Sequence, residues 1–533
     1  MEATEQDKIL SDHLIKNGVD THTVLKHPVG LFVLFFTEMW ERFSYYGMRA
    51  LLVLFLVSTL AENGWQWSRE DALQLYGIYT GLVYFTPLIG GYIADRLTGY
   101  RKAVVWGALI MTLGHASMAL EGMQSYFFYI GLGLIILGNG LFKPNISSIV
   151  GQMYPDNSER KDAGYTIFYM GINSGAFLGM LLCGYLGEKV GWHYGFGLAG
   201  IFMFFGMLQF YFGQKIFGKL GLSPKEEEAY QENHSAPAEA VEEKEKELPK
   251  KVVRDRLIVI GVLIFFSVFF WLAFEQAGGS MTIFANDYTN RVLEGNAGVI
   301  FKWVDAILTV VPLLLLTWVL GKLSIQIAKK YPATIFFTAL SFVIIWGICI
   351  WRLNREFSAM ETEITASWFQ ILNSFFIITL ATPFAKFWEV KFNPSAPIKF
   401  AMGLILLGIG FAALSYGSSA IPSGAQTASV SMIWLVLAYL FHTMGELCLS
   451  PVGLSYMSKL SPKNLIGLIM GFWFLSSAIA LYLGGYIGSY IDQITTMYSM
   501  STFFFMFFAT SVGAGIILLI LSPLLKKMMH GIH

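Results

Sequence analysis

Four charged side chains and two tyrosines lie in one short stretch, EMWERFSYYGMR, which begins at Glu38 inside an otherwise apolar run. At about 100° per residue in a helix, Glu41, Arg42, Tyr45 and Arg49 fall on the same face as Glu38, and the opposite face is uncharged. Ions are costly to bury in a bilayer, so this face must look onto a cavity or onto partner charges. Carboxylates beside guanidinium groups can there bind and release protons, which breaks and remakes ion pairs.

Three further ionisable residues lie in other apolar segments: Lys143 in GNGLFKPNISS, Glu275 in FWLAFEQAGGS and Glu446 in HTMGELCLSPVG. With the first stretch they give three cations and four anions, so one bound proton makes the set neutral. A cluster of salt bridges that only orients helices is the simpler interpretation, but burying so many ions for packing alone is costly. Because the charges are spread over both halves of the chain, they favour a transporter over a scaffold.

Membrane-spanning helices must position these side chains. The chain has 533 residues, 55% of them hydrophobic and 14% charged, and a mean hydropathy of +0.56. Apolar runs of about 20 residues recur, and each is long enough to cross a bilayer as a helix. A formal net charge of zero gives no indication of a nucleic-acid partner. We predict an all-α polytopic membrane protein with about 14 spans, near 30–58, 72–95, 101–120, 124–150, 163–186, 194–215, 257–285, 303–320, 333–351, 366–388, 397–416, 431–457, 464–488 and 502–525.

A charged segment divides the predicted spans into six before it and eight after it. The simplest parsing is an N-terminal six-helix bundle over 1–217, a cytoplasmic charged linker over 218–254, and a C-terminal six-helix bundle over 255–533. The second bundle then carries one extra helical hairpin near 303–351, whose helices hold almost no polar residues. Lys and Arg gather in the even-numbered turns between spans, which predicts that both termini are cytoplasmic.

Amide and indole side chains lie in the predicted spans as well: Trp271, one helical turn before Glu275, and Asn173, Asn373 and Trp473. Alone, each is better read as a helix–helix hydrogen bond or an interfacial anchor, and only the neighbouring charges give it functional weight. A membrane-embedded enzyme is a third alternative, since the HTMGE stretch places a histidine one turn from Glu446. That stretch has no second histidine at metal-ligand spacing, and the three cysteines have none either, so we expect no metal and no cofactor.

Several long motifs resemble the signatures of a known family. They are ExxERFSYYG at 38–47, GGYIADRLTGYRK at 90–102, GNGLFKPNISSIVGQMY at 138–154 and FYMGINSGAFLG at 168–179, followed by FEQAGGS and GELCLSPVGLSY in the second half. They resemble the proton-dependent oligopeptide transporters (POT/PTR), a branch of the major facilitator superfamily. The resemblance implies a proton-coupled symporter that imports di- and tripeptides by alternating access through a central charged cavity. It also implies a monomer in the plasma (inner) membrane, with the proton as coupling ion.

The resemblance also assigns roles. The proton-coupling residues would be Glu38, Glu41, Arg42, Lys143 and Glu446. Arg49 and Glu275 would form a gate salt bridge. The substrate-binding residues would be Arg42, Tyr45, Tyr46, Arg49, Tyr84, Lys143, Asn173, Trp271, Glu275, Asn373, Glu446, Ser450 and Trp473. Fixed opposite charges at the two ends of a short peptide can ignore the identity of its side chains, so broad selectivity is expected.

Two departures from the family pattern stand out. Mammalian members carry a histidine seven residues before the tyrosine matching Tyr84, where this chain has Gly77. Many bacterial members place two extra helices between the halves, whereas here the hairpin follows the helix of Glu275. Relatives that carry nitrate or another small anion leave a second alternative, which Glu446 disfavours because an anion site needs no carboxylate.

Overall fold

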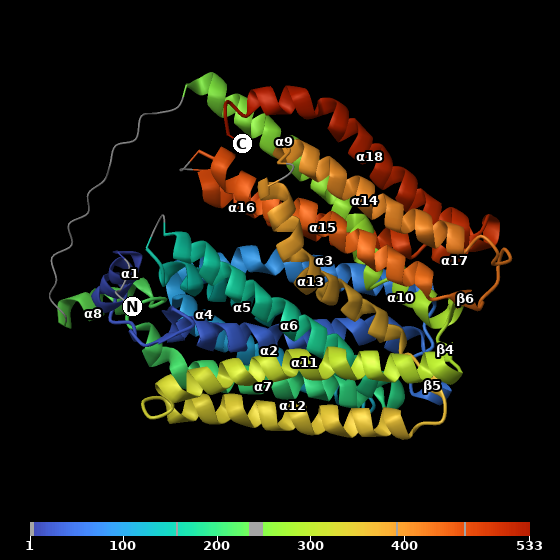
Figure 1. The fold of residues 1–533 in the computed structure, drawn as a ribbon, viewed down its shortest axis with the longest axis horizontal. Coiled ribbons are helices and arrows are strands. Elements are labelled where there is room, and N and C mark those ends of the chain that lie inside the picture. The colour runs from blue at the N-terminus through green and yellow to red at the C-terminus, as the bar shows by residue number, and fades with distance from the viewer. Residues whose placement is uncertain (1–4, 156–157, 234–248, 391–392, 463–464, 533) are drawn as a thin grey trace. The chain divides into compact units, whose positions relative to one another are not determined.

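The computed structural model describes residues 5–155, 158–233, 249–390, 393–462 and 465–532. Almost all of them are helical, as the sequence predicts (Figure 1). Among the described residues, twelve helical segments are long and apolar enough to cross a membrane. Two further helices, α2 (Val29–Val57) and α4 (Tyr100–Met118), cover the predicted spans 30–58 and 101–120 but are not among the twelve. The chain is therefore an all-helical polytopic membrane protein with twelve candidate spans.

The chain forms two compact units. The first comprises Met1–Leu51, Thr86–Pro237 and Val292–Thr365, and the second comprises Leu52–Phe85, Ala238–Arg291 and Ala366–His533. The chain passes between them within α2, within α3 (Arg69–Ile93), and at both ends of the predicted hairpin.

The first unit holds most of α2, the end of α3, α4 and two short pairs of strands. Its other helices are α1 (Glu5–Lys16), α5 (Tyr126–Gln152), α6 (Glu159–Lys189), α7 (Trp192–Gly213), α8 (Pro224–Asn233), α11 (Gly295–Ile327) and α12 (Pro332–Ser358). Its strands pair antiparallel as β1 (Thr23–Val24) with β2 (His27–Pro28) and β4 (Val292–Leu293) with β5 (Thr362–Glu363). Helix α8 lies in the predicted linker, of which residues 234–248 are outside the described part of the chain.

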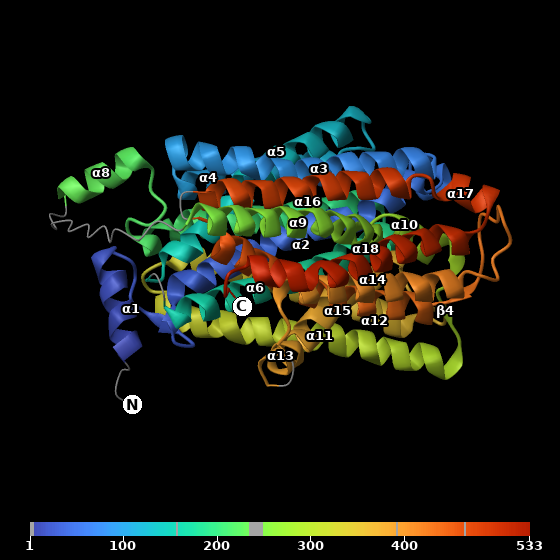
Figure 2. The same ribbon diagram turned by 90° about the horizontal axis from the view of Figure 1, so that it is seen from above.

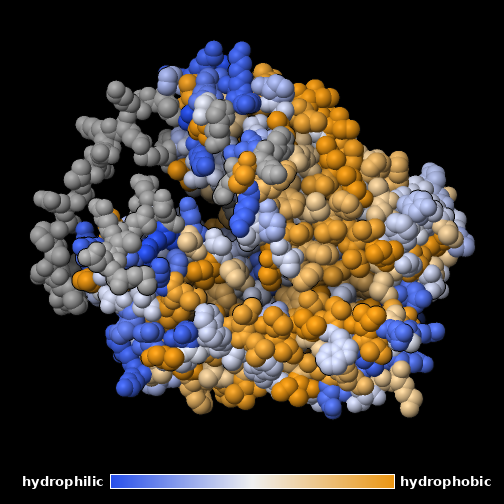
Figure 3. Space-filling view, viewed as in Figure 1, coloured by the Kyte–Doolittle hydropathy of each residue, from blue (hydrophilic) through white to orange (hydrophobic). Residues whose placement is uncertain are grey.

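The second unit holds the remaining helices, and α14 and α18 lie side by side in it (Figures 1 and 2). These helices are α9 (Lys250–Phe274), α10 (Ser280–Ile283), α13 (Ile371–Val390), α14 (Ala396–Gly417), α15 (Ile433–Leu460), α16 (Ile466–Gly488), α17 (Ile491–Met497) and α18 (Met500–Met528). β3 (Thr289–Asn290) pairs parallel with β6 (Val430–Ser431). Hydrophobic residues cover the visible face of α14 and α18, as lipid contact requires (Figure 3).

Helix α2 is placed by a row of glycines on α6. A Cβ added at Gly175 would lie 2.1 Å from the Met39 carbonyl oxygen, and one added at Gly179 would lie 2.2 Å from that of Phe43. No other residue permits so close a backbone approach, which explains the four-residue spacing in the GINSGAFLG stretch. The contact fixes α2 against α6 at the level of its charged residues, since a Cβ added at Gly175 would also lie 3.0 Å from the Arg42 Cβ.

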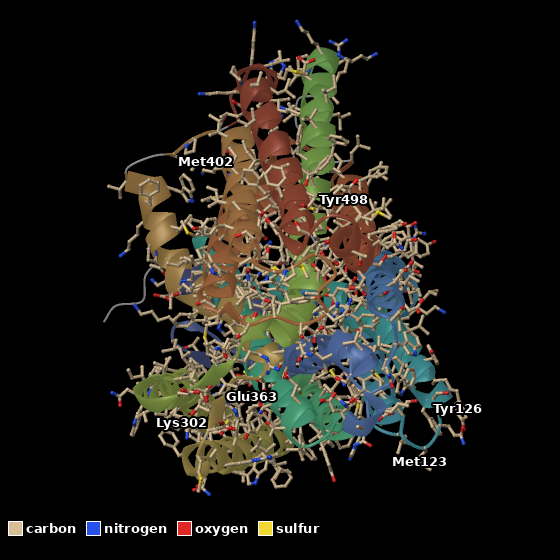
Figure 4. The ribbon with its side chains drawn as sticks, turned by 90° about the vertical axis from the view of Figure 1, so that its right-hand side faces the viewer. Met123, Tyr126, Lys302, Glu363, Met402 and Tyr498 are labelled. Carbon is tan, nitrogen blue, oxygen red and sulfur yellow. The ribbon has the colours of Figure 1, made fainter. Side chains whose placement is uncertain are left out.

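The predicted hairpin near 303–351 consists of α11 and α12. It follows the linker in the chain but belongs to the first unit, where α12 packs against α7 (Figure 1). At one end of the hairpin Lys302 donates to the Ala359 carbonyl oxygen at 2.7 Å, and Glu363 pairs with Lys189 of α6 (Figure 4). The domain boundaries expected from chain order stay a prediction.

Candidate functional site

The charged face of α2 carries a buried ion cluster in the first unit. The Arg42 Nε lies 2.9 Å from Glu38 Oε1 and is also paired with Glu41 Oε2. All three side chains are at most 4% exposed. Two carboxylates therefore share one guanidinium group, and the spacing of four residues between Glu38 and Arg42 is the one at which such pairs meet on a helix. Protonation of either carboxylate would leave the other as the partner of Arg42.

Helix α5 brings an amide and an ammonium group to the same cluster. Asn139 is fully buried and its Nδ2 donates to Glu41 Oε1 at 2.9 Å. Lys143 follows one turn later, so it lies on the same face of α5, and it interacts electrostatically with both Glu38 and Glu41. Asn139 was missed by sequence reasoning because an asparagine in a transmembrane helix is ordinarily a packing residue. Its position four residues before Lys143 is the signal that could have found it.

Tyrosines extend the cluster along α2. The Arg42 guanidinium lies 5.6 Å from the ring centre of Tyr45, and that of Arg49 lies 5.4 Å from the ring centre of Tyr46. The two tyrosine rings meet edge to face, with centres 5.1 Å apart. Asn173 of α6 is buried, and its Nδ2 donates to the carbonyl oxygen of Tyr169 in its own helix. This bond stays within α6, so it does not decide between a helix–helix packing role and a substrate-binding role for Asn173.

In the second unit, Glu275 is buried where α9 gives way to a turn of 3₁₀ helix (Glu275–Ala277). It accepts a short hydrogen bond from the hydroxyl of Tyr76 on α3. The glycines that follow interrupt the helix and let it resume as α10. The predicted Arg49–Glu275 gate stays a prediction, and Tyr76 is a partner of Glu275 that the sequence did not indicate.

Glu446 of α15 is held by two polar neighbours in the same unit. The Asn373 Nδ2 on α13 donates to Glu446 Oε2 at 2.9 Å and to Thr443 Oγ1 at 3.1 Å. Asn373 and Glu446 are both half-buried, so an amide from α13 orients a carboxylate that solvent can reach. The structure thus joins two of the residues that the resemblance assigns to substrate binding. Thr443, one turn before Glu446, is a further member that was missed.

The remaining predicted side chains of the second unit differ in burial and in their contacts. Trp473 is 5% exposed and meets Phe400 edge to face. Trp271 packs against Phe274. Tyr84 and Ser450 are half-buried.

The histidine site of mammalian members has no room for a side chain here. A Cβ added at Gly77 would lie 2.9 Å from the Cα of Gly485 and 2.8 Å from the Tyr482 carbonyl oxygen. The backbones of α3 and α16 therefore touch at this point.

A single arginine at the start of α3, which the sequence analysis did not single out, binds several acceptors. Arg69 donates to Asp287 Oδ2 at 2.7 Å, to Asp492 Oδ1 at 2.8 Å and to the Tyr288 hydroxyl at 2.9 Å. These contacts tie α3 to the segment after α10 and to α17. Within the described residues, no group of three or more histidine, cysteine or acidic side chains could hold a metal ion.

The family model described as "PTR2: POT family" matches residues 101–236 and 332–506, which together are more than half of the chain. The chain belongs to the POT family. It is therefore a transporter and not an enzyme.

Curated relatives are similar to this chain over nearly its whole length. The chain is 34% identical to the uncharacterized transporter YclF of Bacillus subtilis, over 97% of this chain and 99% of that protein. It is 31% identical to the peptide transporter YePEPT of Yersinia enterocolitica, over 95% and 96%. It is 32% identical to the di-/tripeptide transporter of Lactococcus lactis subsp. cremoris, over 95% and 97%.

Solved structures agree as well. A crystal structure of a mutant peptide transporter POT in complex with alafosfalin matches with a TM-score of 0.72 and 31% identity, over 99% of this chain and 100% of that one. A POT family transporter in complex with 5-aminolevulinic acid matches with a TM-score of 0.73 and 26% identity, over 96% and 99%. The architecture of the chain is that of this transporter family.

Proposed function

We propose that this protein is a proton-coupled symporter that imports di- and tripeptides by alternating access through a central charged cavity. Relatives described as peptide and di-/tripeptide transporters, about 30% identical over almost the full length, support the choice of substrate. The observation that carries the proposal is the buried cluster of Glu38, Glu41 and Arg42, with Lys143 beside it. Burying one ion in a bilayer costs roughly several kcal/mol. No packing role therefore requires two carboxylates on one arginine.

Peptide binding would use the two charged groups separately. Arg42 and Lys143 present positive charge to the peptide carboxylate, and Glu446, oriented by Asn373, receives the terminal ammonium group. A charge at each end recognises the peptide backbone and leaves the side chains free to vary. Tyr45 and Tyr46 line the first of these positions.

Proton coupling would follow from competition for Arg42. When the peptide carboxylate takes the guanidinium group, one of Glu38 and Glu41 loses its partner and binds a proton. When the peptide leaves, the carboxylate releases the proton and pairs with Arg42 again. Each cycle therefore moves a proton with the peptide, and no cofactor is needed.

The same proposal fixes the setting of the protein. Helices α2 and α4 complete fourteen spans with the twelve candidates, in a plasma (inner) membrane and with both termini cytoplasmic. The protein acts as a monomer, and Arg49 with Glu275 closes the extracellular side.

Uptake into proteoliposomes tests the function. With an inward proton gradient, the wild type should concentrate a labelled dipeptide. Glu41→Gln should abolish concentration while preserving exchange of internal for external peptide, and Lys143→Ala should abolish concentration. Glu356→Gln is the matched control, because Glu356 is a half-buried membrane glutamate that accepts a hydrogen bond from Tyr185 at 2.6 Å outside the cluster.

Two outcomes would overturn the proposal. Folded wild-type protein that concentrates no dipeptide would reject the function, and concentrative uptake by Glu41→Gln would remove Glu41 from coupling. The alternative of a transporter for nitrate or another small anion is tested by adding excess nitrate with the labelled dipeptide. We expect nitrate not to reduce dipeptide uptake.

A further inference from the structure

The extra hairpin presents one narrow buried stripe to the other helices of the first unit. The stripe runs along α12 at helical spacing and consists of Thr334, Thr338, Ser341, Phe342, Ile345, Cys349 and Arg352. Neighbouring positions such as Phe336 and Val343 are exposed and face outward. Small and hydroxyl-bearing residues dominate the stripe, which allows close approach and hydrogen bonding between helices in lipid.

Phe342 reaches the back of the helix that carries the ion cluster. Its ring meets Phe36 and Trp40 of α2 edge to face, with centres 5.5 Å and 5.6 Å apart. Trp40 in turn stacks on Phe202 of α7 at 4.7 Å. Phe36 and Trp40 are one turn apart, on the side of α2 opposite to Glu38. The hairpin therefore packs against α2 from behind the charged face.

A buried glutamine ties the same three helices together by hydrogen bonds. Gln209 of α7 is fully buried. Its Nε2 donates to the Val33 carbonyl oxygen and to Thr37 Oγ1 of α2, both at 3.0 Å, and its Oε1 accepts from Thr338 Oγ1 of α12 at 2.9 Å. Thr37 directly precedes Glu38. Since an unsatisfied buried amide is costly, the carboxamide holds α2 and α12 in one register.

The hairpin is fixed at other levels too, so that it can act as a rigid support. Lys330, in the turn between its helices, donates to Asp20 Oδ2 at 2.7 Å. Within the hairpin, Arg352 pairs with Asp305 at 2.9 Å, and its guanidinium lies 4.9 Å from the ring centre of Tyr185 on α6. These contacts lie at different heights along α12, so the hairpin cannot pivot about a single point.

We propose that the extra hairpin braces the proton-coupling helix, and that Phe342 and Gln209 are positioning residues that fix the rotation of α2 so that Glu41 meets Asn139 and Lys143 of α5. This inference rests on the proposed function. A rotation of about 20° moves a side chain at a radius of about 6 Å by about 2 Å. That displacement breaks the 2.9 Å bond from Asn139 to Glu41 and changes the proton affinity of the cluster.

The test compares Phe342→Ala with Phe337→Ala in proteoliposomes. Phe337 is on the same helix and stacks on Phe212 of α7 at 5.5 Å, but it is half-buried and none of its ring contacts in the described part of the chain is with α2, so its removal truncates an aromatic contact of the hairpin outside the brace. We expect Phe342→Ala and Gln209→Leu to lower peptide accumulation at a fixed proton gradient by at least about threefold and to move the pH profile of uptake, with exchange nearly unchanged. Phe342→Leu should restore most of the accumulation, and Phe337→Ala should keep the wild-type profile.

The outcomes separate the brace from the function itself. Equal pH profiles in Phe342→Ala, Phe337→Ala and the wild type would reject the brace while leaving peptide transport intact. If the wild type concentrates no peptide, the proposed function fails, and the brace is tested by the melting temperature as a function of pH. Phe342→Ala and Gln209→Leu should then change the shape of that curve, whereas Phe337→Ala should only lower it, and curves of one shape would reject the brace. If Phe342→Ala does not fold, Gln209→Leu and Phe342→Leu carry the comparison.

Discussion

Neutralising one member of the Asp305–Arg352 pair should destabilise the hairpin more than replacing both. The Arg352 Nη2 lies 2.9 Å from Asp305 Oδ2 and 3.0 Å from Oδ1, and each side chain is 4% exposed. Its Nη1 has a weak contact with Thr309 Oγ1 at 3.4 Å. The pair joins α11 to α12 inside a hairpin whose outer surface is apolar.

The magnitude follows from the distance and the burial. Two unit charges about 2.9 Å apart attract by about 6 kcal/mol at an effective dielectric constant of about 20. Desolvation cancels much of this attraction, so the pair contributes little net stability. Removing one partner leaves the other buried and uncompensated, which costs about 3–5 kcal/mol. Asp305→Asn and Arg352→Met should each lose this amount, and the double variant Asp305→Leu/Arg352→Met should recover most of it.

The assay is thermal unfolding of the purified protein in detergent, followed by tryptophan fluorescence. Both single variants should melt several degrees below the wild type, and the double variant should melt close to it. Glu363→Gln is the control, because Glu363 pairs with Lys189 while 43% exposed and should cost less than about 1 kcal/mol. Single variants that melt with the wild type, or a double variant less stable than both, would refute the reasoning.

Three further predictions concern other parts of the molecule. Arg69→Met should lower the melting temperature by removing two charged hydrogen bonds worth about 2–3 kcal/mol together, and Arg69→Lys should restore less than half of the loss because it lacks the planar fork. Gly77→Val should cost about 1–3 kcal/mol, since a Cβ there would lie 2.8 Å from a carbonyl oxygen of α16, whereas Gly133→Val, with no atom within 4 Å, should be neutral. Burial of Asp20 alone would raise its pKa, but hydrogen bonds from Lys330 and a histidine outweigh burial and lower the pKa to about 2. A carboxyl whose pKa is lowered by folding stabilises the fold above its unfolded pKa of 3.8, and this contribution is lost as the pH falls toward 2. Asp20→Asn should therefore be less stable than the wild type by about 2 kcal/mol at neutral pH. Near pH 2 the two proteins should be equally stable.

Each of these has a contrary result. An Arg69→Lys protein that melts with the wild type would mean that the fork geometry is unimportant, and an Arg69→Met protein that does so would mean that the two charged hydrogen bonds contribute nothing. A Gly77→Val protein as stable as Gly133→Val would contradict the backbone contact between α3 and α16. A difference between the wild type and Asp20→Asn that stays constant from pH 7 to about pH 2 would show that Asp20 has an ordinary pKa.

Local patterns in the sequence predicted the parts of the site that a single helix determines. The shared face of Glu38, Glu41 and Arg42 follows from helical geometry alone, and in the structure Arg42 pairs with both carboxylates. Every predicted span coincides with a helix for the same reason, because apolar runs of this length are visible without any knowledge of packing. Helix α8 lies within the predicted linker, and its mixed charge is equally typical of a solvated linker.

Contacts between distant parts of the chain could not be predicted from the residues. The bond from Tyr76 to Glu275 joins positions 199 residues apart, and nothing near Tyr76 marks it as a partner. The hairpin was predicted, but its place against α7 depends on Gln209 and Thr338, which look like ordinary polar residues in apolar helices. Such partners become recognisable only when the helices have been packed.

The coupling of peptide movement to proton movement is the central claim, and it can be measured in reverse. Proteoliposomes are prepared with a pH-sensitive dye inside and with no initial pH gradient. Unlabelled dipeptide is then added outside, so that its concentration gradient is directed inward. Linkage requires that the peptide gradient drives protons in the same direction, so the lumen of wild-type vesicles should acidify, and Glu41→Gln vesicles should not. Peptide entry into wild-type vesicles without any change of internal pH would contradict the account.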